Sequence, residues 1–209
     1  MIKAMPTYYF PNRLGRIMLL ALEEVMGKSG LNALLNLSSL SLLIENYPSD
    51  DDDKIISFEI ISQLQHALEQ GYGPHGGRGL ALRAGRIFFS NGLRTYGPEL
   101  GLNDTAFRLQ PPDLKLMDVL YSLTDFFNQY TNQQVVLEEN EQSILWRIER
   151  CPWCWKRKEF EPACHFAVGM LQEALYWVSG GKFYNVMEET CIAQGDSACL
   201  IVVDRTPLA

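Results

Sequence analysis

The chain has 209 residues, of which 47% are hydrophobic and 21% are charged, and its net charge is −7. These values predict one compact domain with a buried core and exclude an intrinsically disordered chain. The acidic charge disfavours nucleic-acid binding, because phosphate contacts need concentrated Lys and Arg. No apolar stretch approaches the roughly 20 residues of a membrane span, and the N-terminus lacks a signal-peptide pattern. We therefore expect a cytoplasmic protein without a membrane span.

The first 130 residues are predicted to be mostly helical. Apolar residues recur at helical spacing over 14–25, and a second helix is expected over 31–43. Three further amphipathic helices are predicted over 57–69, 80–96 and 113–129.

Two segments between these helices are predicted to be loops. Residues 49–54 read SDDDDK and are expected to form a solvated loop, because adjacent carboxylates in a flexible loop rarely form a defined cation cage. Residues 71–79 are rich in glycine but fit neither common phosphate-binding pattern. We expect a flexible loop there, in which His75 could line a pocket.

The periodicity changes after residue 133. The pattern predicts a hairpin, a helix and two further strands, over 134–139, 143–150, 163–178, 182–191 and 198–204. Helices followed by a ββαββ order predict an α+β fold with helices packed on a four-stranded antiparallel sheet. We expect a single domain over 1–209, with a helical part at about 11–130 and a sheet with a metal-binding lobe at about 133–204.

All five cysteines fall in the last third of the chain. A turn should fold Cys191 back toward Cys199, and Cys164 stands at a predicted helix start, where the dipole favours a thiolate. On a regular strand Glu189 would share a face with Cys191, whereas a bulge would select Glu188. Three thiolates and one carboxylate complete a closed tetrahedral site of the structural zinc type.

A second cysteine signal is the CxxC motif Cys151-Pro-Trp-Cys154. This motif is common both as half of a zinc site and as a redox pair. It is not a haem-attachment motif, because Trp155 stands where that motif has His. Buried thiols without chemistry remain a third interpretation of the cysteines, since free Cys is often a small core residue.

The C-terminal residues resemble the vinyl-reductase-type domain family, also described as 4-vinyl reductase or hydrocarbon-binding. The most specific pattern is E-x-x-C-x-x-x-G-D-x-x-C, carried here by Glu188, Cys191, Gly195, Asp196 and Cys199. The family is named after a protein of bacteriochlorophyll synthesis and includes the sensor domains of phenol- and xylene-responsive regulators. Its fold is shared with transport-particle subunits. The resemblance is strong over about 150–203 and weak before that.

This resemblance implies a zinc site and a neighbouring pocket. The implied zinc ligands are Cys164, Glu188, Cys191 and Cys199, with Cys151 and Cys154 as alternatives. The choice of Glu188 requires a bulge just before Cys191. Candidate residues for a hydrophobic-ligand pocket are Trp146, Phe166, Met170, Tyr176, Trp177, Phe183, Tyr184 and His75. Ordinary core packing is the competing interpretation of each aromatic residue.

Three functions are compatible with these features. The first is a sensor or carrier of a hydrophobic or aromatic small molecule, with a structural zinc, as a free-standing version of the sensor-like domain. The second is an accessory or carrier protein in (bacterio)chlorophyll-type tetrapyrrole synthesis, although the lack of a dinucleotide fingerprint argues against direct reductase catalysis. The third is an interaction scaffold that forms a homodimer through its Leu-rich N-terminal helices. A homodimer is expected in any case from the family fold.

Overall fold

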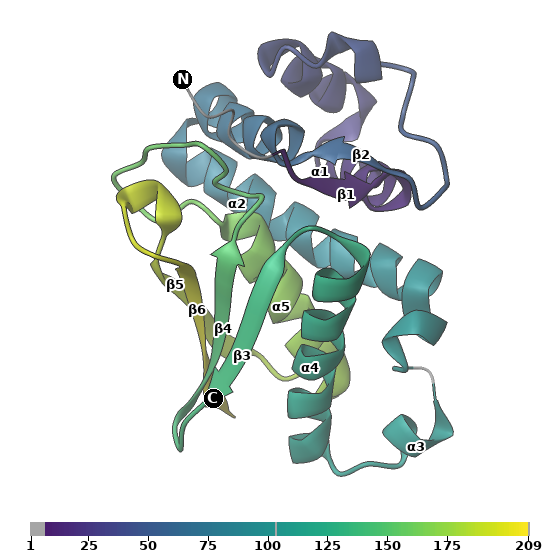
Figure 1. Ribbon diagram of the computed structural model, residues 1–209, viewed down its shortest axis with the longest axis vertical. Coiled ribbons are helices and arrows are strands. Elements are labelled where there is room, and N and C mark those ends of the chain that lie inside the picture. Colours follow the sequence, from purple (N-terminus) through teal and green to yellow (C-terminus); the bar gives the residue numbers. More distant parts are fainter. Residues whose placement is uncertain (1–6, 103, 209) are drawn as a thin grey trace.

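The computed structural model describes residues 7–102 and 104–208. Its N-terminal part contains two long helices and a two-stranded β-ribbon (Figure 1). The elements are β1 (Tyr9–Pro11), α1 (Asn12–Leu37), the 3₁₀ turn η1 (Ser41–Leu43), β2 (Lys54–Ser57) and α2 (Phe58–Leu100). Each long helix is bent at one glycine, Gly27 (φ 74°) and Gly73 (φ 73°), in the left-handed region that costs glycine little.

The C-terminal part is a four-stranded antiparallel sheet with its helices. The elements are α3 (Thr105–Arg108), α4 (Pro112–Tyr130), β3 (Gln134–Glu139), β4 (Ser143–Arg150), α5 (His165–Val178), β5 (Tyr184–Thr190), the 3₁₀ turn η2 (Ile192–Gln194) and β6 (Cys199–Pro207). The strands pair in the order β3-β4-β6-β5, all antiparallel. The predicted α+β class with a four-stranded antiparallel sheet is therefore confirmed.

One face of the sheet forms the core. On β4, Ile144, Trp146 and Ile148 are buried while the residues between them are half-buried, as alternation along a strand requires. Ile201 and Val203 continue this face on β6. Helix α5 packs against both α2 and β5, so it joins the sheet to the helical part (Figure 1).

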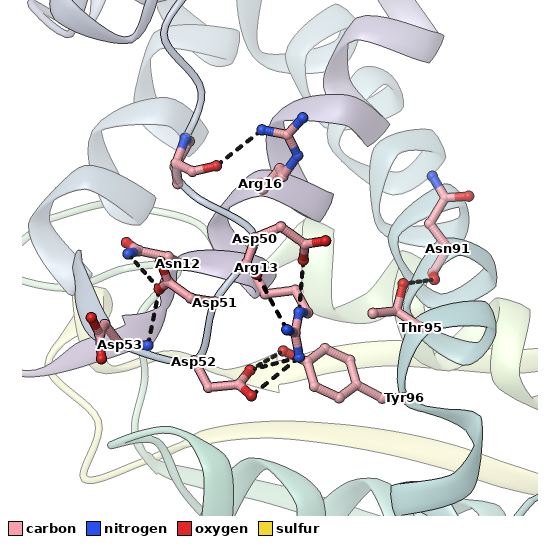
Figure 2. A network of polar contacts seen from close by, with 11 residues as sticks. Asn12, Arg13, Arg16, Asp50, Asp51, Asp52, Asp53, Asn91, Thr95 and Tyr96 are labelled. Atoms are coloured by element: carbon pink, nitrogen blue, oxygen red, sulfur yellow. Dashed lines mark hydrogen bonds and ion pairs between the residues drawn. The ribbon is translucent and has the colours of Figure 1, made fainter.

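The acidic segment at 50–53 is a loop, as expected, but it is held against the start of α1 (Figure 2). The Arg13 guanidinium pairs with Asp50 at 2.7 Å and with Asp52 at 3.1 Å. The Asn12 amide donates to Asp51 Oδ1 at 2.8 Å. These contacts use the carboxylates to fix the chain before β2, so the segment is more than a solvated connection.

The predicted loop at 71–79 is wrong. Within residues 71–79 the chain leaves the helical conformation at Gly73 alone and continues as α2, with Pro74 in the first turn after the bend. Proline is tolerated there because the N–H groups of a first turn have no partner within the helix. The helix expected over 31–43 ends earlier, at Leu37. Within the described residues, no helix is both long and apolar enough to cross a membrane.

Candidate metal centre

The five cysteines of the chain come together at one end of the sheet. Cys151 follows β4, Cys154 lies in the next turn and Cys164 immediately precedes α5. Cys191 lies between β5 and η2, and Cys199 is the first residue of β6. All five are free thiols and at most 1% exposed. We refer to these five residues as the thiol cluster.

The sulfur atoms of the thiol cluster are close neighbours. The Sγ–Sγ distances are 3.4 Å for Cys151–Cys164 and for Cys154–Cys199, and 3.6 Å for Cys164–Cys199. Cys191 lies 3.9 Å from Cys164 and 3.8 Å from Cys199. A disulfide would need about 2.0 Å. Metal–sulfur bonds of about 2.3 Å in a tetrahedron place the sulfurs about 3.8 Å apart, which is close to the observed spacing.

A carboxylate completes the cluster because β5 contains a bulge. The pairing with β6 shifts between Glu188 and Thr190, so Glu188 faces the core at 8% exposure while Glu189 is exposed. The backbone N–H of Cys164 donates to Glu188 Oε2 at 2.7 Å. The other oxygen, Oε1, is buried without a hydrogen-bond partner. A buried carboxylate oxygen without a donor calls for a cation or another donor beside it.

The backbone around the thiol cluster is well fixed. The Ile192 N–H donates to Cys199 Sγ at 3.3 Å, and the Cys191 N–H donates to Asp196 Oδ2 at 2.9 Å. Gly195 closes this turn with a φ of 104°, which a side chain would disfavour. The Glu159 N–H donates to the Ala193 carbonyl at 2.9 Å and ties the long β4–α5 connection to η2.

The low polarity of the site changes its acid–base properties. Burial raises the pKa of Cys151 to about 12 and raises that of Cys164 well above its ordinary value. Hydrogen bonds from neighbouring thiols, Cys151 first, lower the pKa of Cys154. Burial also raises the pKa of Glu188 to about 7. Without a cation, Cys151 and Cys164 therefore keep their protons near neutral pH, and a bound cation would replace these protons.

The residues predicted for a ligand pocket are not gathered in one cavity. Phe166 stacks on Trp153 with ring centroids 4.4 Å apart, and Trp146 is fully buried on β4. Tyr176 and Trp177 are 38% and 39% exposed. Tyr184 is buried, Phe183 is exposed, and Met170 and His75 line two separate hollows.

The two apolar cavities between the helices are small. A cavity of about 20 Å³ lies between α1, α2, α4 and α5, with Phe88, Tyr96, Phe126 and Met170 among its lining residues. A second cavity, beside Trp153, measures about 10 Å³. Each has room for about one water molecule. A larger hollow of about 250 Å³ is a polar groove at the surface, lined by His75, Arg78 and His165 among others.

Solved structures with this fold include H-NOX proteins. The Fe(II) unliganded H-NOX protein from K. algicida matches with a TM-score of 0.59 at 15% identity, over 95% of this chain and 97% of that chain. An oxygen-binding H-NOX domain related to soluble guanylate cyclases matches with a TM-score of 0.56 at 10% identity, over 91% of this chain and 93% of that chain. A structure described under "Modulating Heme Redox Potential Through Protein-Induced Porphyrin Distortion" matches with a TM-score of 0.60 at 10% identity, over 93% and 98%. No protein-family model and no curated protein matches the sequence.

These matches correct the family expected from the sequence. The expectation of a vinyl-reductase-type domain is wrong, because solved structures that match more than nine-tenths of this chain are H-NOX proteins. The zinc cofactor and the hydrophobic-ligand sensor or carrier that came with that family are wrong on the same finding, and so are the tetrapyrrole and scaffold alternatives. The likeness itself, at 10–16% identity, establishes the fold alone.

A haem, the cofactor named for one of these neighbours, does not fit the described interior. Haem iron is held by His, Cys, Met or Tyr. The three histidines are His66, His75 and His165, and none of them lines either apolar cavity. Tyr96 and Met170 do line the larger cavity, but the Tyr96 hydroxyl donates to Asp52 and the space equals about one water.

Proposed function

We propose that this protein is a metal-binding domain whose functional centre is the thiol cluster with Glu188. The observation that carries the proposal is the approach of five buried sulfurs to within 3.4–3.9 Å of one another along a connected path. Soft thiolate ligands select soft transition-metal ions over Mg²⁺ or Ca²⁺. The proposed ligands are Cys164, Glu188, Cys191 and Cys199, together with Cys151 and Cys154.

The unpartnered oxygen of Glu188 supports a metal over a cluster of inert thiols. Packing alone would account for buried cysteines, which behave as small apolar residues. It would not account for a carboxylate that is 8% exposed and leaves Oε1 without a donor. A cation beside the sulfurs would compensate this oxygen and stabilise the thiolates at the same time.

The proposed role of the centre is to hold three segments together. Its ligands come from the end of β4 and the following turn, from the residue before α5, and from the β5–β6 connection. All six proposed ligands are buried protein groups, which is typical of structural rather than catalytic metal sites. Reduced thiols of this kind persist in a reducing compartment, so the proposal also favours the cytoplasm.

We do not propose a haem-based gas sensor. Neither of the two apolar cavities between the helices is lined by a histidine, and each has space for about one water molecule. The metal chemistry that we propose for this chain therefore uses the thiol cluster, at the end of the sheet.

The test is the metal content of the full chain. The protein would be purified without a tag, under reducing conditions and without chelators, and its transition metals measured by mass spectrometry. We expect at least one ion per chain, and loss of that metal in the Cys164→Ser/Cys199→Ser variant. The exposed neighbour variant Glu189→Gln is the matched control and should keep its metal. A folded protein that holds no transition metal, as purified and after incubation with Co²⁺ or Cd²⁺, would overturn the proposal.

A further inference from the structure

The thiol cluster contains more ligands than one tetrahedral ion can use. Five sulfurs and one carboxylate are buried together, whereas a tetrahedral centre takes four ligands. With a single ion, two of the six groups would remain buried and protonated beside it. A single tetrahedral ion therefore cannot use all six ligand groups.

The geometry divides them into two overlapping sets. One set is Cys151, Cys154, Cys164 and Cys199, and its ligand atoms all lie within 4.8 Å of one another. The other set is Cys164, Glu188, Cys191 and Cys199, with the same property. The two sets share only Cys164 and Cys199, whose sulfurs are 3.6 Å apart. Two tetrahedral metal sites that share the Cys164–Cys199 edge would use the six ligand groups in this way.

The closest contacts agree with this division. Cys151 is 3.4 Å from Cys164 and Cys154 is 3.4 Å from Cys199, so each lies against one of the two shared sulfurs. Cys191 contacts both shared sulfurs, at 3.9 and 3.8 Å. The unpartnered Oε1 of Glu188 belongs to the set that contains Cys191.

We infer that the centre is binuclear, with the thiolates of Cys164 and Cys199 bridging two soft metal ions. Cys151 and Cys154 are the terminal ligands of the first ion, and Cys191 and Glu188 are those of the second. This inference rests on the proposed function, because it requires that the cluster binds metal at all. Each ion then has four ligands, and no ligand group is left over.

Charge is compatible with two ions. Four ionised ligands around one divalent ion and six around two both leave two negative charges, so the second ion adds no charge imbalance to the buried site while it uses the two remaining ligand groups. The Ile192 N–H that points at the Cys199 sulfur adds a further dipole at a bridging thiolate.

The test uses Cd²⁺ as the probe. The full chain would be stripped of metal under reducing conditions and titrated with cadmium-113, with bound metal counted by mass spectrometry and observed by NMR. We expect two ions per chain and two resonances of equal intensity, one from a four-sulfur site and one from a three-sulfur, one-oxygen site. Coupling between the two resonances would report the bridging thiolates directly.

Each outcome separates the inference from the proposed function. One ion per chain would overturn the binuclear centre and leave the metal-binding domain in place, whereas no ion would overturn both. Two uncoupled resonances would overturn the bridging role of Cys164 and Cys199.

Selective variants give an independent test. Cys151→Ser/Cys154→Ser should lose the four-sulfur resonance and keep the other. Glu188→Gln, which preserves volume, should weaken binding of the second ion at least about tenfold and leave the four-sulfur resonance present. Glu189→Gln, one residue away and exposed, should retain both ions. Circular dichroism of each variant would verify the fold, and equal loss of both ions in Glu188→Gln would contradict the division.

Discussion

Gly85 of α2 and Gly169 of α5 allow the two helices to touch backbone to backbone. A Cβ on Gly85 would lie 2.1 Å from the carbonyl oxygen of Phe166, and a Cβ on Gly169 would lie 2.1 Å from that of Leu82. Because both obstacles are backbone atoms, no side-chain rotation can relieve them. Cys164 is the residue before α5, so the helix that follows Cys164 is the one held against α2 by this crossing.

The Gly169→Ala variant is expected to be strongly destabilised. The added methyl group must push α5 away from α2, and overpacking of this kind costs about 1–3 kcal/mol or more in the free energy of unfolding. Urea denaturation would measure this loss in the free energy of unfolding. The matched control is Gly79→Ala, a helical glycine whose added Cβ meets nothing within 4 Å, and which should be neutral or slightly stabilising. Equal stability of the two variants would contradict the close crossing.

The ion pairs of Arg13 are expected to make a modest contribution to stability. Arg13 is 26% exposed and binds both Asp50 and Asp52, so Arg13→Gln should lower the free energy of unfolding by about 1 kcal/mol. The comparison variant is Lys28→Gln, which breaks a more exposed pair with Glu45 and should change stability less than Arg13→Gln does. A larger loss in Lys28→Gln would contradict this ranking.

Tyr96 is expected to make the fold sensitive to alkaline pH. Burial, with Asp52 beside the hydroxyl, raises the pKa of Tyr96 above its ordinary value of 10.0. The folded state then holds this proton at a pH at which the unfolded chain loses it. The stabilisation is complete below pH 10 and is lost as the pH rises from 10 toward the folded pKa.

Unfolding curves measured between about pH 9 and pH 11 would test this, since the ordinary Tyr pKa of about 10 lies in that window. As the pH rises, the free energy of unfolding of the Tyr96→Phe variant should fall less steeply than that of the natural chain. Tyr121→Phe, at an exposed position, should keep the natural slope. The same slope in Tyr96→Phe and the natural chain would show that Tyr96 does not titrate differently on folding.

The thiol cluster is expected to resist thiol reagents until its metal is removed. All five cysteines are at most 1% exposed, and coordination would protect them further. We expect fewer than one reactive thiol per native chain with a colorimetric disulfide reagent, and a rise toward five after a chelator is added. In denaturant with chelator, five thiols should react at once. Rapid labelling of the native, metal-loaded protein would argue against the centre.

Hemin is expected not to form a defined complex with this chain. The described apolar cavities hold about one water molecule each and have no histidine in their walls. A titration followed by absorbance should therefore give no saturable one-to-one complex with a sharp haem band. The appearance of such a complex, lost in a Met170→Ala or Tyr96→Phe variant, would reverse the conclusion on haem.

The local hydrophobic pattern of the sequence was sufficient to predict most helices and strands of this fold. Alternating β-formers around Asn140 predict the β3–β4 hairpin, and the observed strands Gln134–Glu139 and Ser143–Arg150 confirm it. Helical periodicity likewise predicts α4 and α5 to within two residues. The short strands β1 and β2 were missed, because a three- or four-residue strand carries too little periodicity to be recognised.

Local pattern was misleading where a tertiary contact decided the conformation. The glycine-rich stretch at 71–79 has the composition of a loop, yet Gly77 packs its backbone against Leu68 and the helix continues. The family resemblance at the C-terminus was wrong for a related reason. A short cysteine pattern reports a local turn, whereas the similarity to H-NOX proteins extends over more than nine-tenths of the chain.

The sequence by itself determined the α+β class, the antiparallel sheet and the grouping of the cysteines in the last third of the chain, because these depend on periodicity and on turns between neighbouring residues. Only the tertiary structure decided that Cys151 and Cys154 join Cys164, Cys191 and Cys199 in one cluster. It also decided that a bulge turns Glu188 inward. Both depend on the pairing of β4 and β5 with β6 and on the packing of α5, which bring together residues that are far apart in the chain.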